Sequence, residues 1–472
     1  MKQLVIIILF FVSIGVVHAQ QDSTVLTFDE YYSLVINNHP IVKQAQLLTE
    51  SASQEVRLAR GSFDPKLEGS WDFKEFKDSE YYNKLDVSLK IPTWFPVNPV
   101  VGVERNLGNN LNPENYIAPT TDYQQLYAGV SVPIGQGLFI DQRRATLRKA
   151  QLLQDMAEAD QIKEINKILL TATKDYWEWY YAYNNYALLQ RSIALAQDIF
   201  NRTKMAYDYG EAAPIDTVQA KINLLNRVTA MQQANIERVR AGLNLSNHLW
   251  TEGGEPLELD VNVIPESPLV NTLAPSLLAE LLDGALENHP EIRKLDLKNE
   301  SLIVDRRLAR ENIKPKLNLN YYLLDQPFDY QLNSNELMFD ENYKVGLEFS
   351  IPVFLRKERA KLKQANIYLK QNAYQIDFTQ RQILNEINAQ YNEAFTTANI
   401  LKQQQEMVSN YELLLQAERL NIENGESDLF KLNVQMDKLI ESQTKLIKLQ
   451  SAYQKDVASL YWAAGITNLG RE

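Results

Sequence analysis

Two long stretches of this chain contain neither proline nor glycine, and they limit the folds that the chain can adopt. They run from Leu138 to Tyr209 and from Val353 to Asn424. Because proline and glycine interrupt helices, each stretch predicts one continuous helix of about 100 Å, at about 1.5 Å per residue. Apolar residues recur in both at steps of three and four, which is the spacing of a coiled-coil seam. An amphipathic helix in a globular bundle would show the same stripe, but not the same length.

The chain also contains two copies of one unit. Three motifs of the first copy recur in the second at one common separation: Asn38-His39-Pro40 as Asn288-His289-Pro290, Arg57-Leu58-Ala59-Arg60 as Arg307-Leu308-Ala309-Arg310, and Pro65-Lys66-Leu67 as Pro315-Lys316-Leu317. Farther on the separation falls, so the first copy carries an insertion of about 31 residues between Leu67 and Val132. We therefore expect a first repeat over residues 20–260 and a second over residues 261–472.

Each copy has two shorter helical stretches that together match the length of its long helix. They cover residues 27–60 and 214–250 in the first copy and residues 275–311 and 428–464 in the second. One long helix is therefore expected to pack along two short helices in series. Because proline removes a backbone donor and restricts the residue before it, we expect a kink or break in the first short helix at Asn38-His39-Pro40. Both repeated histidines, His39 and His289, are interpreted as structural rather than as ligands.

Between the helices, the apolar period changes from about 3.5 to two, which is typical of strands. Alternation covers residues 85–91 and 126–134 in the first copy and residues 317–321 and 345–353 in the second. Aromatic residues gather around these segments, as they do in the interfacial girdles of membrane strands: Trp71, Phe73, Tyr81, Tyr82, Trp94, Phe95, Tyr321, Tyr322 and Tyr343. A sheet packed on a helix would alternate in the same way, so the strands alone leave both interpretations open.

The simplest interpretation gives each copy of the unit one strand hairpin, and therefore about four strands per chain. Four strands cannot close a transmembrane barrel, and open strand edges are not tolerated in lipid. Several chains must then share one barrel, and three would supply about twelve strands. The insertion could add a second hairpin from residues 85–91 and 100–105, or it could project as a loop.

The first residues of the chain have the form of a secretory signal peptide over residues 1–19. Lys2 precedes an apolar run from Leu4 to Val17, and Val17-His18-Ala19 supplies a small-residue cleavage site. No other stretch is long and apolar enough to predict a membrane-spanning helix. The net charge of −12 argues against a nucleic-acid partner, and the absence of cysteine excludes disulfides and thiolate chemistry.

The signal peptide, the tandem copies and the recurring order of elements resemble the TolC family of outer-membrane efflux proteins, over essentially the whole mature chain. The resemblance implies a mostly helical fold with a small β part, in which duplicated coiled-coil hairpins and strand hairpins of a homotrimer form a shared twelve-stranded transmembrane β-barrel and a periplasmic α-barrel tunnel. It also implies location in the outer membrane, with contacts to lipid, to a periplasmic adaptor (membrane fusion) protein and to an inner-membrane pump.

In this family the functional end is the periplasmic tip, where the long helix turns back. The matching residues here are Gly210, Glu211 and Asp216 in the first copy and Gly425, Glu426 and Asp428 in the second. The sequence departs from the family pattern at the second tip, because Lys431, or Asn433 if one residue is inserted, stands where an aspartate is usual. Asp216 is equally well explained as a carboxylate favoured at a helix start. We hypothesise that the four carboxylates flank the entrance of the tunnel, where they would favour cations.

The sequence therefore predicts a passive outer-membrane channel of a tripartite efflux or type I secretion system. It contains no phosphate-binding loop, no His-x-x-x-His pair and no nucleophile elbow, so we expect no enzyme activity, no cofactor and no metal. The main alternative is an exported coiled-coil structural protein of the cell envelope, which would not explain strands at equivalent places in both copies. A diffusion porin would consist mostly of strands.

Overall fold

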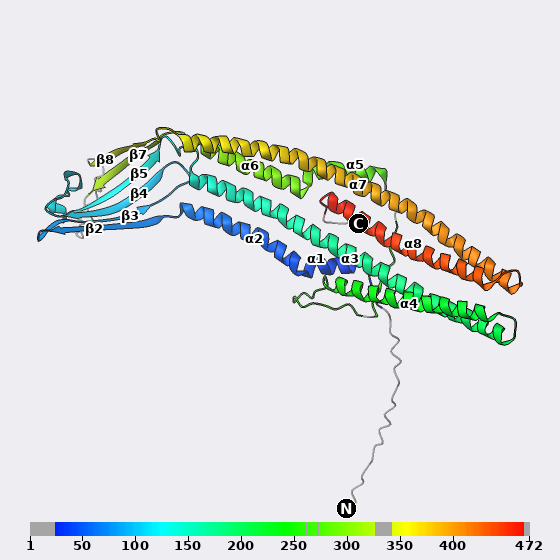
Figure 1. Cartoon of the computed structure of the whole chain (residues 1–472). Helices are drawn as coiled ribbons and strands as arrows, with labels where there is room; N and C mark the ends of the chain where they lie inside the picture. Colours follow the sequence, from blue (N-terminus) through cyan, green and yellow to red (C-terminus); the bar gives the residue numbers. More distant parts are fainter. Residues whose placement is uncertain (1–23, 261, 271–272, 326–341, 467–472) are drawn as a thin grey trace, which may run out of the picture. The chain divides into compact units, whose positions relative to one another are not determined.

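The computed structural model describes residues 24–260, 262–270, 273–325 and 342–466 (Figure 1). The expected signal peptide lies outside these residues. The chain divides into two compact units, each assembled from three stretches of sequence. The first, which we call the tip unit, comprises Met1–His39, Thr171–Thr272 and Phe395–Lys455. The second, the sheet unit, comprises Pro40–Leu170, Leu273–Ala394 and Asp456–Glu472.

The two stretches without proline and glycine form the long helices α3 (Gln142–Asp208) and α7 (Arg356–Glu423), of 67 and 68 residues. Both predicted helices are confirmed, with ends a few residues inside the predicted limits. The shorter helices are α1 (Phe28–Asn38), α2 (Pro40–Arg60), α4 (Pro214–Ser246), α5 (Pro275–Asn288), α6 (Pro290–Glu311) and α8 (Leu429–Ala463). The same order of helices thus flanks the strands of both copies, although the boundary between the copies at residue 260 stays a prediction.

The predicted helix break lies at His39, and the structure has a second break at His289, the equivalent position of the second copy. Both residues are extended, with φ and ψ of −61° and 131° at His39 and −62° and 128° at His289. Each backbone N–H still donates to the carbonyl four residues earlier, on Val35 and Ala285, at 3.1 Å. The proline that follows then starts a new helix, because its fixed φ suits the first helical position and it has no N–H to satisfy there.

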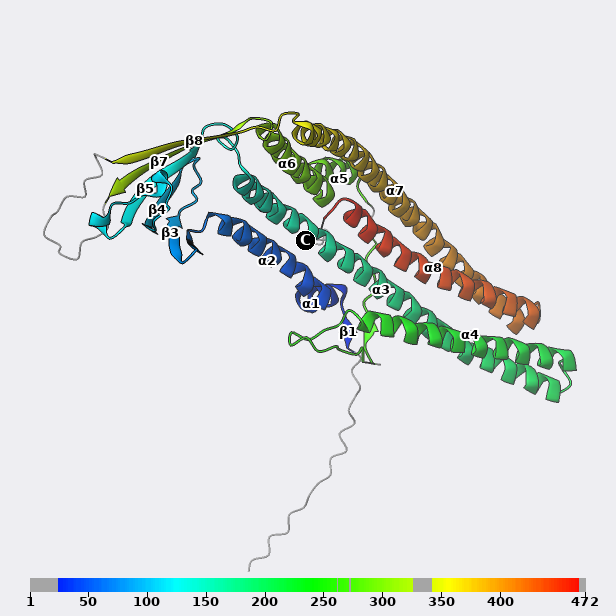
Figure 2. The ribbon, with the colours of Figure 1, turned by 60° about the vertical axis from the view of Figure 1, so that its left-hand side comes forward.

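The strands of the sheet unit form one six-stranded antiparallel sheet (Figure 2). Its strands are β2 (Lys66–Phe76), β3 (Ser79–Lys90), β4 (Asn98–Leu107), β5 (Gln124–Pro133), β7 (Lys316–Asp325) and β8 (Tyr343–Ser350), and they neighbour each other in this order. The simplest interpretation, one hairpin in the first copy, is therefore wrong, and the alternative of a second hairpin from the insertion is confirmed. The inserted residues supply β3 and β4. These strands lie between β2 and β5, where β3 pairs with β2 and β4 pairs with β5.

The pairing register places apolar residues on one face of this sheet. One row crosses all six strands through Leu67, Leu89, Val101, Ala128, Leu323 and Tyr343. Because side chains alternate along a strand, this face, which we call the apolar face, also carries Trp71, Leu85, Val87, Val103, Val130, Leu319, Tyr321, Val345 and Leu347. The opposite, polar face carries Glu68, Lys84, Asp86, Ser88, Gly102, Glu104, Tyr127, Tyr322 and Glu348.

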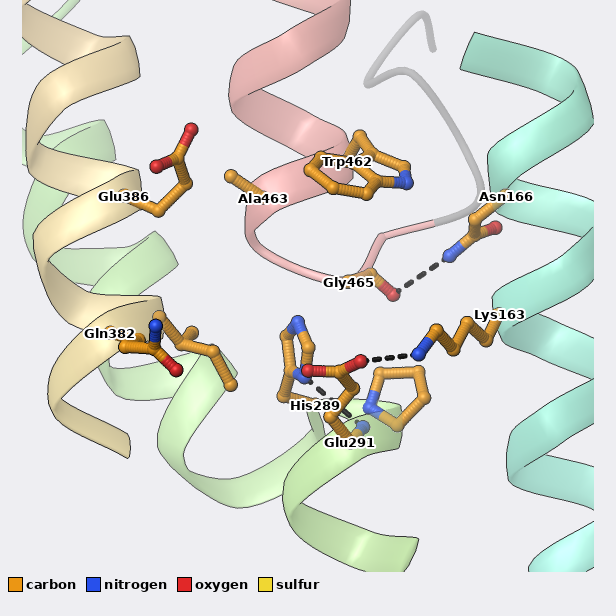
Figure 3. Close-up of a pocket in the computed structure, with 11 residues that line it drawn as sticks. Lys163, Asn166, His289, Glu291, Gln382, Glu386, Trp462, Ala463 and Gly465 are labelled. Carbon is orange, nitrogen blue, oxygen red and sulfur yellow. Dashed lines mark hydrogen bonds and ion pairs between the residues drawn. The ribbon is translucent and has the colours of Figure 1, made fainter. Parts of the chain in front are cut away.

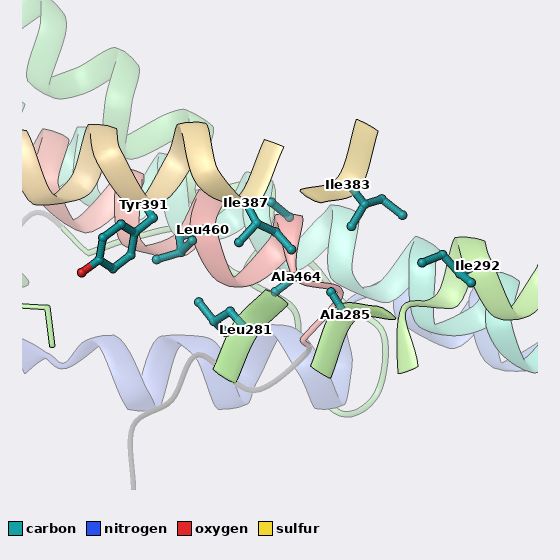
Figure 4. Packing of buried hydrophobic residues seen from close by; sticks show 9 residues of the cluster. Leu281, Ala285, Ile292, Ile383, Ile387, Tyr391, Leu460 and Ala464 are labelled. Carbon is teal, nitrogen blue, oxygen red and sulfur yellow. The ribbon is translucent and has the colours of Figure 1, made fainter. Parts of the chain in front are cut away.

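Helices of the sheet unit pack around an apolar cluster that joins α5, α6, α7 and the end of α8. Leu281, Ile292, Ile387 and Leu460 are among its buried members (Figure 4). Ion pairs follow the contact between α3 and α6 and include Lys149 with Asp305 at 2.9 Å, Lys294 with Asp160 at 2.6 Å and Arg293 with Glu158 at 3.1 Å. Since these charges are partly exposed, burial of the apolar cluster contributes more to stability than the pairs do.

The tip unit has a second core, which lies between α3, α4, α7 and α8. Its buried members include Leu189, Ala234, Leu415 and Met436. Farther from the tips, Phe28 of α1 stacks on Trp177 of α3 at 5.6 Å between ring centroids. Two short strands, β1 (Val25–Leu26) and β6 (Ile264–Pro265), pair in parallel beside this aromatic group. These contacts fix the start of the first copy and the segment that follows residue 260 against the middle of α3.

Candidate functional site

The apolar face of the sheet is open to its surroundings rather than packed on a helix. Leu67, Trp71, Leu347 and Phe349 are 75%, 67%, 63% and 66% exposed. A contiguous apolar face of this kind is costly in water and marks a surface that meets lipid or another protein. The strands are 8 to 12 residues long, which is close to the length of strands that cross a membrane.

The polar face is held together by side chains that reach across strands. Lys90 Nζ lies 2.6 Å from Glu68 Oε2, which links β3 to β2. Tyr127 of β5 donates its hydroxyl proton to Asp86 of β3 at 3.1 Å, and its ring passes over Gly102 of the intervening β4. A Cβ at Gly102 would lie 2.4 Å from that ring, so any larger residue there would displace the Tyr127 side chain.

This cross-strand contact was not predicted from the sequence. A glycine inside a run that otherwise reads as a strand signals a close approach of another group. That signal was present at Gly102, but it does not identify Tyr127 as the partner, because the register of the pairing is needed. The register also corrects the interpretation of Tyr322, which the sequence grouped with the aromatic residues of a possible girdle. It lies on the polar face and therefore does not belong to an aromatic girdle on the apolar face.

The first predicted tip is a tight turn between α3 and α4. Gly210 has φ of +79°, its N–H donates to Tyr207 O at 2.9 Å, and Glu211 N–H donates to Ala206 O at 2.8 Å. This pair of hydrogen bonds is a Schellman motif, which satisfies the last carbonyls of a helix and favours glycine at the left-handed position. Asp216 Oδ2 accepts a hydrogen bond from Ala213 N–H at 3.1 Å, so its carboxylate caps the start of α4.

The second tip repeats this geometry between α7 and α8. Gly425 has φ of +77°, and its N–H donates to Ile422 O at 3.0 Å, while Glu426 N–H donates to Asn421 O at 2.8 Å. The cap of the following helix is Asp428, whose Oδ1 accepts from Lys431 N–H at 2.9 Å. The cap thus comes from a residue one turn earlier than at the first tip.

Both turns lie at the same end of the tip unit, to the right in Figure 1. The four carboxylates that the sequence singled out, Glu211, Asp216, Glu426 and Asp428, are all exposed there. Lys431 occupies the position that corresponds to Asp216, and Asn433 is buried. Each copy of the chain therefore presents two carboxylates from each tip to solvent.

The two repeated histidines occupy structural positions. His39 is 6% exposed and its ring lies 5.5 Å from the ring of His248, which in turn lies 2.8 Å from Asp175 Oδ2 through its Nε2. Burial, and then the neighbouring His248, lower the pKa of His39 to about 4. His289 Nδ1 accepts from Glu291 N–H at 3.2 Å and so caps α6, and burial lowers its pKa as well.

A cavity of about 420 Å³ lies beside His289 in the sheet unit (Figure 3). Lys163 pairs with Glu291 in its wall, and Asn166 Nδ2 donates to Gly465 O at 3.3 Å. These polar groups bond to one another and join α3, α6 and the segment after α8. Within the described ranges, no three His, Asp or Glu side chains are close enough together to hold a metal ion.

Comparisons with known proteins agree with this architecture. Residues 281–466 match the family model described as outer membrane efflux protein. The chain is 25% identical over 300 residues to the alkaline protease secretion protein AprF of Pseudomonas aeruginosa, and the alignment covers 60% of this chain and 60% of that protein. The chain thus aligns with less than two thirds of the length of this relative.

Among solved structures, the outer membrane channel CmeC of Campylobacter jejuni is similar, with a TM-score of 0.64 at 14% identity over 93% of this chain and 85% of that one. The open state of the MtrE outer membrane channel of Neisseria gonorrhoeae is also similar, with a TM-score of 0.65 at 14% identity over 93% of this chain and 88% of that one. These likenesses show that the chain has the fold of TolC-type outer-membrane channels, as the repeat motifs indicated.

The helices in the described part of the chain differ from membrane-spanning helices. None of them combines the length and the apolar character that crossing a bilayer requires.

Proposed function

We propose that this chain is the outer-membrane channel subunit of a tripartite efflux or type I secretion system. Cargo passes through it passively, from an inner-membrane pump and a periplasmic adaptor to the exterior. The observation that carries the proposal is the sheet with one exposed apolar face and one polar face, joined directly to very long helices. The apolar face meets the lipid of the outer membrane, and the polar face lines a water-filled lumen.

The open edges of the sheet support an assembly of several copies. β2 and β8 are its outermost strands, and unpaired strand edges are too costly to remain in lipid. Copies of the chain must therefore pair edge to edge until the sheet closes. We take the number of copies as three, as the resemblance to the TolC family implies.

The exported structural module is the weaker alternative, because it would bury the apolar face against another element. Relatives also favour transport. The name of AprF states a role in the secretion of an alkaline protease by that protein, and the similar solved structures are titled as channels. Selection of cargo lies with the pump, so the channel itself is proposed to be a passive conduit and not an enzyme.

The orientation of the two faces is tested by a matched pair of adjacent substitutions in β8. Leu347→Lys places a charge on the apolar face, and we expect it to lower stability in lipid by about 2–4 kcal/mol and to reduce the yield of assembled protein in the outer membrane. Glu348→Lys places the same charge on the polar face. We expect it to assemble normally and to shift ion selectivity towards anions.

These outcomes are measured by heat-modifiable migration of the assembled protein and by single-channel recording in planar bilayers. Equal losses for both variants would show that neither face of β8 meets lipid. Native protein that stays soluble without detergent and does not conduct would overturn the proposed function.

We further propose that Glu211, Asp216, Glu426 and Asp428 flank the periplasmic entrance, where Gly210 and Gly425 form the turns. Their support is their exposure at one end of the tip unit. Threefold symmetry would gather three copies of each carboxylate around one axis, which favours cations over anions. The double variant Asp216→Asn, Asp428→Asn removes two of these charges from each chain, and it should reduce cation selectivity several-fold. Unchanged selectivity and conductance would discard this role.

A further inference from the structure

The inserted hairpin of β3 and β4 is a full part of the sheet. β3 pairs with β2 from Lys90 to Ser79, with one register shift between Lys74 and Glu75, and β4 pairs with β3 and β5 over eight residues on each side. The strands β2 to β5 therefore form a meander in which each strand pairs with the next.

The inserted strands also carry the same two faces as their neighbours. Leu85 and Val87 of β3 and Val103 of β4 lie on the apolar face, in line with Trp71 and Gly69 of β2. Leu85, Val87 and Val103 are exposed. A hairpin that projected into water as a loop would not need an uncovered apolar side in register with the rest of the sheet.

The hairpin is anchored at the middle of β3 and at the turn between β3 and β4. On the polar face, the hydroxyl of Tyr127 reaches across β4 to Asp86 of β3. At the end nearest the helices, Trp94 in the turn between β3 and β4 stacks on Phe63 at 4.5 Å between ring centroids. Arg143 of α3 donates to Asn98 Oδ1, at the start of β4, at 3.1 Å. The turn is thus fixed at the level where the other strands join their helices.

We infer that three copies of this chain close a barrel of eighteen strands, six from each copy, in which β2 of one copy pairs with β8 of the next. The inference rests on the proposed trimeric channel and concerns its size and its subunit contact. Because barrel diameter grows roughly linearly with strand number, eighteen strands enclose a lumen about 1.5 times as wide as twelve. The insertion thereby widens the outer exit without a change in the number of copies.

Adjacent positions in β3 provide the test of whether this hairpin faces lipid. The chain contains no cysteine, so a single cysteine can carry a spin label at a chosen site. In trimers reconstituted in lipid nanodiscs, we expect the label at Leu85→Cys to be accessible to oxygen, as at Leu347→Cys in β8. The label at Lys84→Cys should be accessible to a water-soluble nickel complex, as at Glu348→Cys.

The contact between copies is tested by disulfide formation. Ser70→Cys in β2 is combined in turn with Gly346→Cys, Glu348→Cys or Ser350→Cys in β8, all on the polar face. One combination should give covalent trimers on oxidation, while Ser70→Cys with Leu347→Cys, on opposite faces, should not. Electron cryo-microscopy of the same trimers then counts the strands directly.

Eighteen strands, with alternating accessibility in β3, would support the inference. Conducting trimers with twelve strands, or with labels at Lys84→Cys and Leu85→Cys equally open to water, would overturn the strand number and leave the channel function standing. Protein that neither forms trimers nor conducts would instead overturn the proposed function, and the barrel with it.

Discussion

The two copies of the unit keep the same helices but differ in their strands. Both have a long helix, a histidine–proline break and a glycine turn with the same pair of hydrogen bonds. The first copy, however, places four strands in the sheet and the second places two. Two added antiparallel strands bring the chain back to the same end of the sheet. β5 therefore keeps its direction and still leads into α3. The helical parts of this fold are therefore constrained in length, while the sheet can grow by two strands at a time.

The sharpest contrast between the strands of the two copies lies at two glycines. A Cβ at Gly129 in β5 would lie 2.2 Å from the backbone oxygen of Tyr321, whereas a Cβ at Gly346 in β8 has its nearest neighbour at 3.9 Å. Gly129→Ala should separate β5 from β7 and lower stability by about 3 kcal/mol, which we expect to prevent trimer assembly. Heat-modifiable migration on gels measures the loss.

Gly346→Ala is the matched control. With room for the methyl group, it should leave trimer stability within about 0.5 kcal/mol of the parent. If both variants assembled equally well, the close contact between β5 and β7 would not exist in the membrane.

The two histidine breaks should differ in their response to pH. The pKa of His39 falls from 6.5 to about 4 in the folded chain. As the pH is lowered below 6.5, the unfolded chain binds a proton that folded His39 does not accept until the pH approaches 4. Stability is therefore present above pH 6.5 and falls as the solution becomes more acidic, by about 2 kcal/mol at pH 5.

Thermal unfolding of detergent-solubilised protein at pH 7 and pH 5 checks this expectation. In the variant His39→Gln, the difference between the melting temperatures at pH 7 and pH 5 should be smaller than in the parent protein. His289→Gln, at the equivalent break in the second copy, should retain more of it, because His39 also faces His248 whereas His289 has the carboxylate of Glu291 nearby. Equal pH responses in both variants would contradict a special environment for His39.

The two tips should behave alike. Gly210 and Gly425 have nearly the same positive φ, and a Cβ added at either would have no atom within 4 Å. Gly210→Ala and Gly425→Ala should each cost about 1 kcal/mol, because the only penalty is the left-handed backbone. Urea unfolding followed by circular dichroism can compare them. A much larger loss at one tip would reveal a contact that only this turn makes.

The sequence alone was sufficient for the helices, and insufficient for the sheet. Long runs without proline or glycine, the repeated Asn-His-Pro motifs and the glycine turns depend on local backbone chemistry, which a sequence displays. The number of strands does not. β4 contains Val100, Val101 and Val103 around a glycine, a pattern that fits either a strand or a loop segment. Only the pairing with β3 and β5 decides between them.

The tip residues show a similar limit. The sequence located Gly210 and Gly425 because positive φ favours glycine. It did not show that Asp216 and Asp428 cap their helices from different positions, since that depends on where each helix begins. Whether the carboxylates also act on passing ions depends on neighbouring copies, which a single chain does not contain.

The unpaired edges of β2 and β8 have a consequence for biogenesis. A single copy that has left the inner membrane but has not met its partners carries two open strand edges and an uncovered apolar face. Such a species readily joins the wrong partner or aggregates. For the proposed trimeric channel, the monomer must therefore be short-lived or chaperoned in transit, and the yield of channels should depend more steeply on subunit supply than on the stability of any one helix.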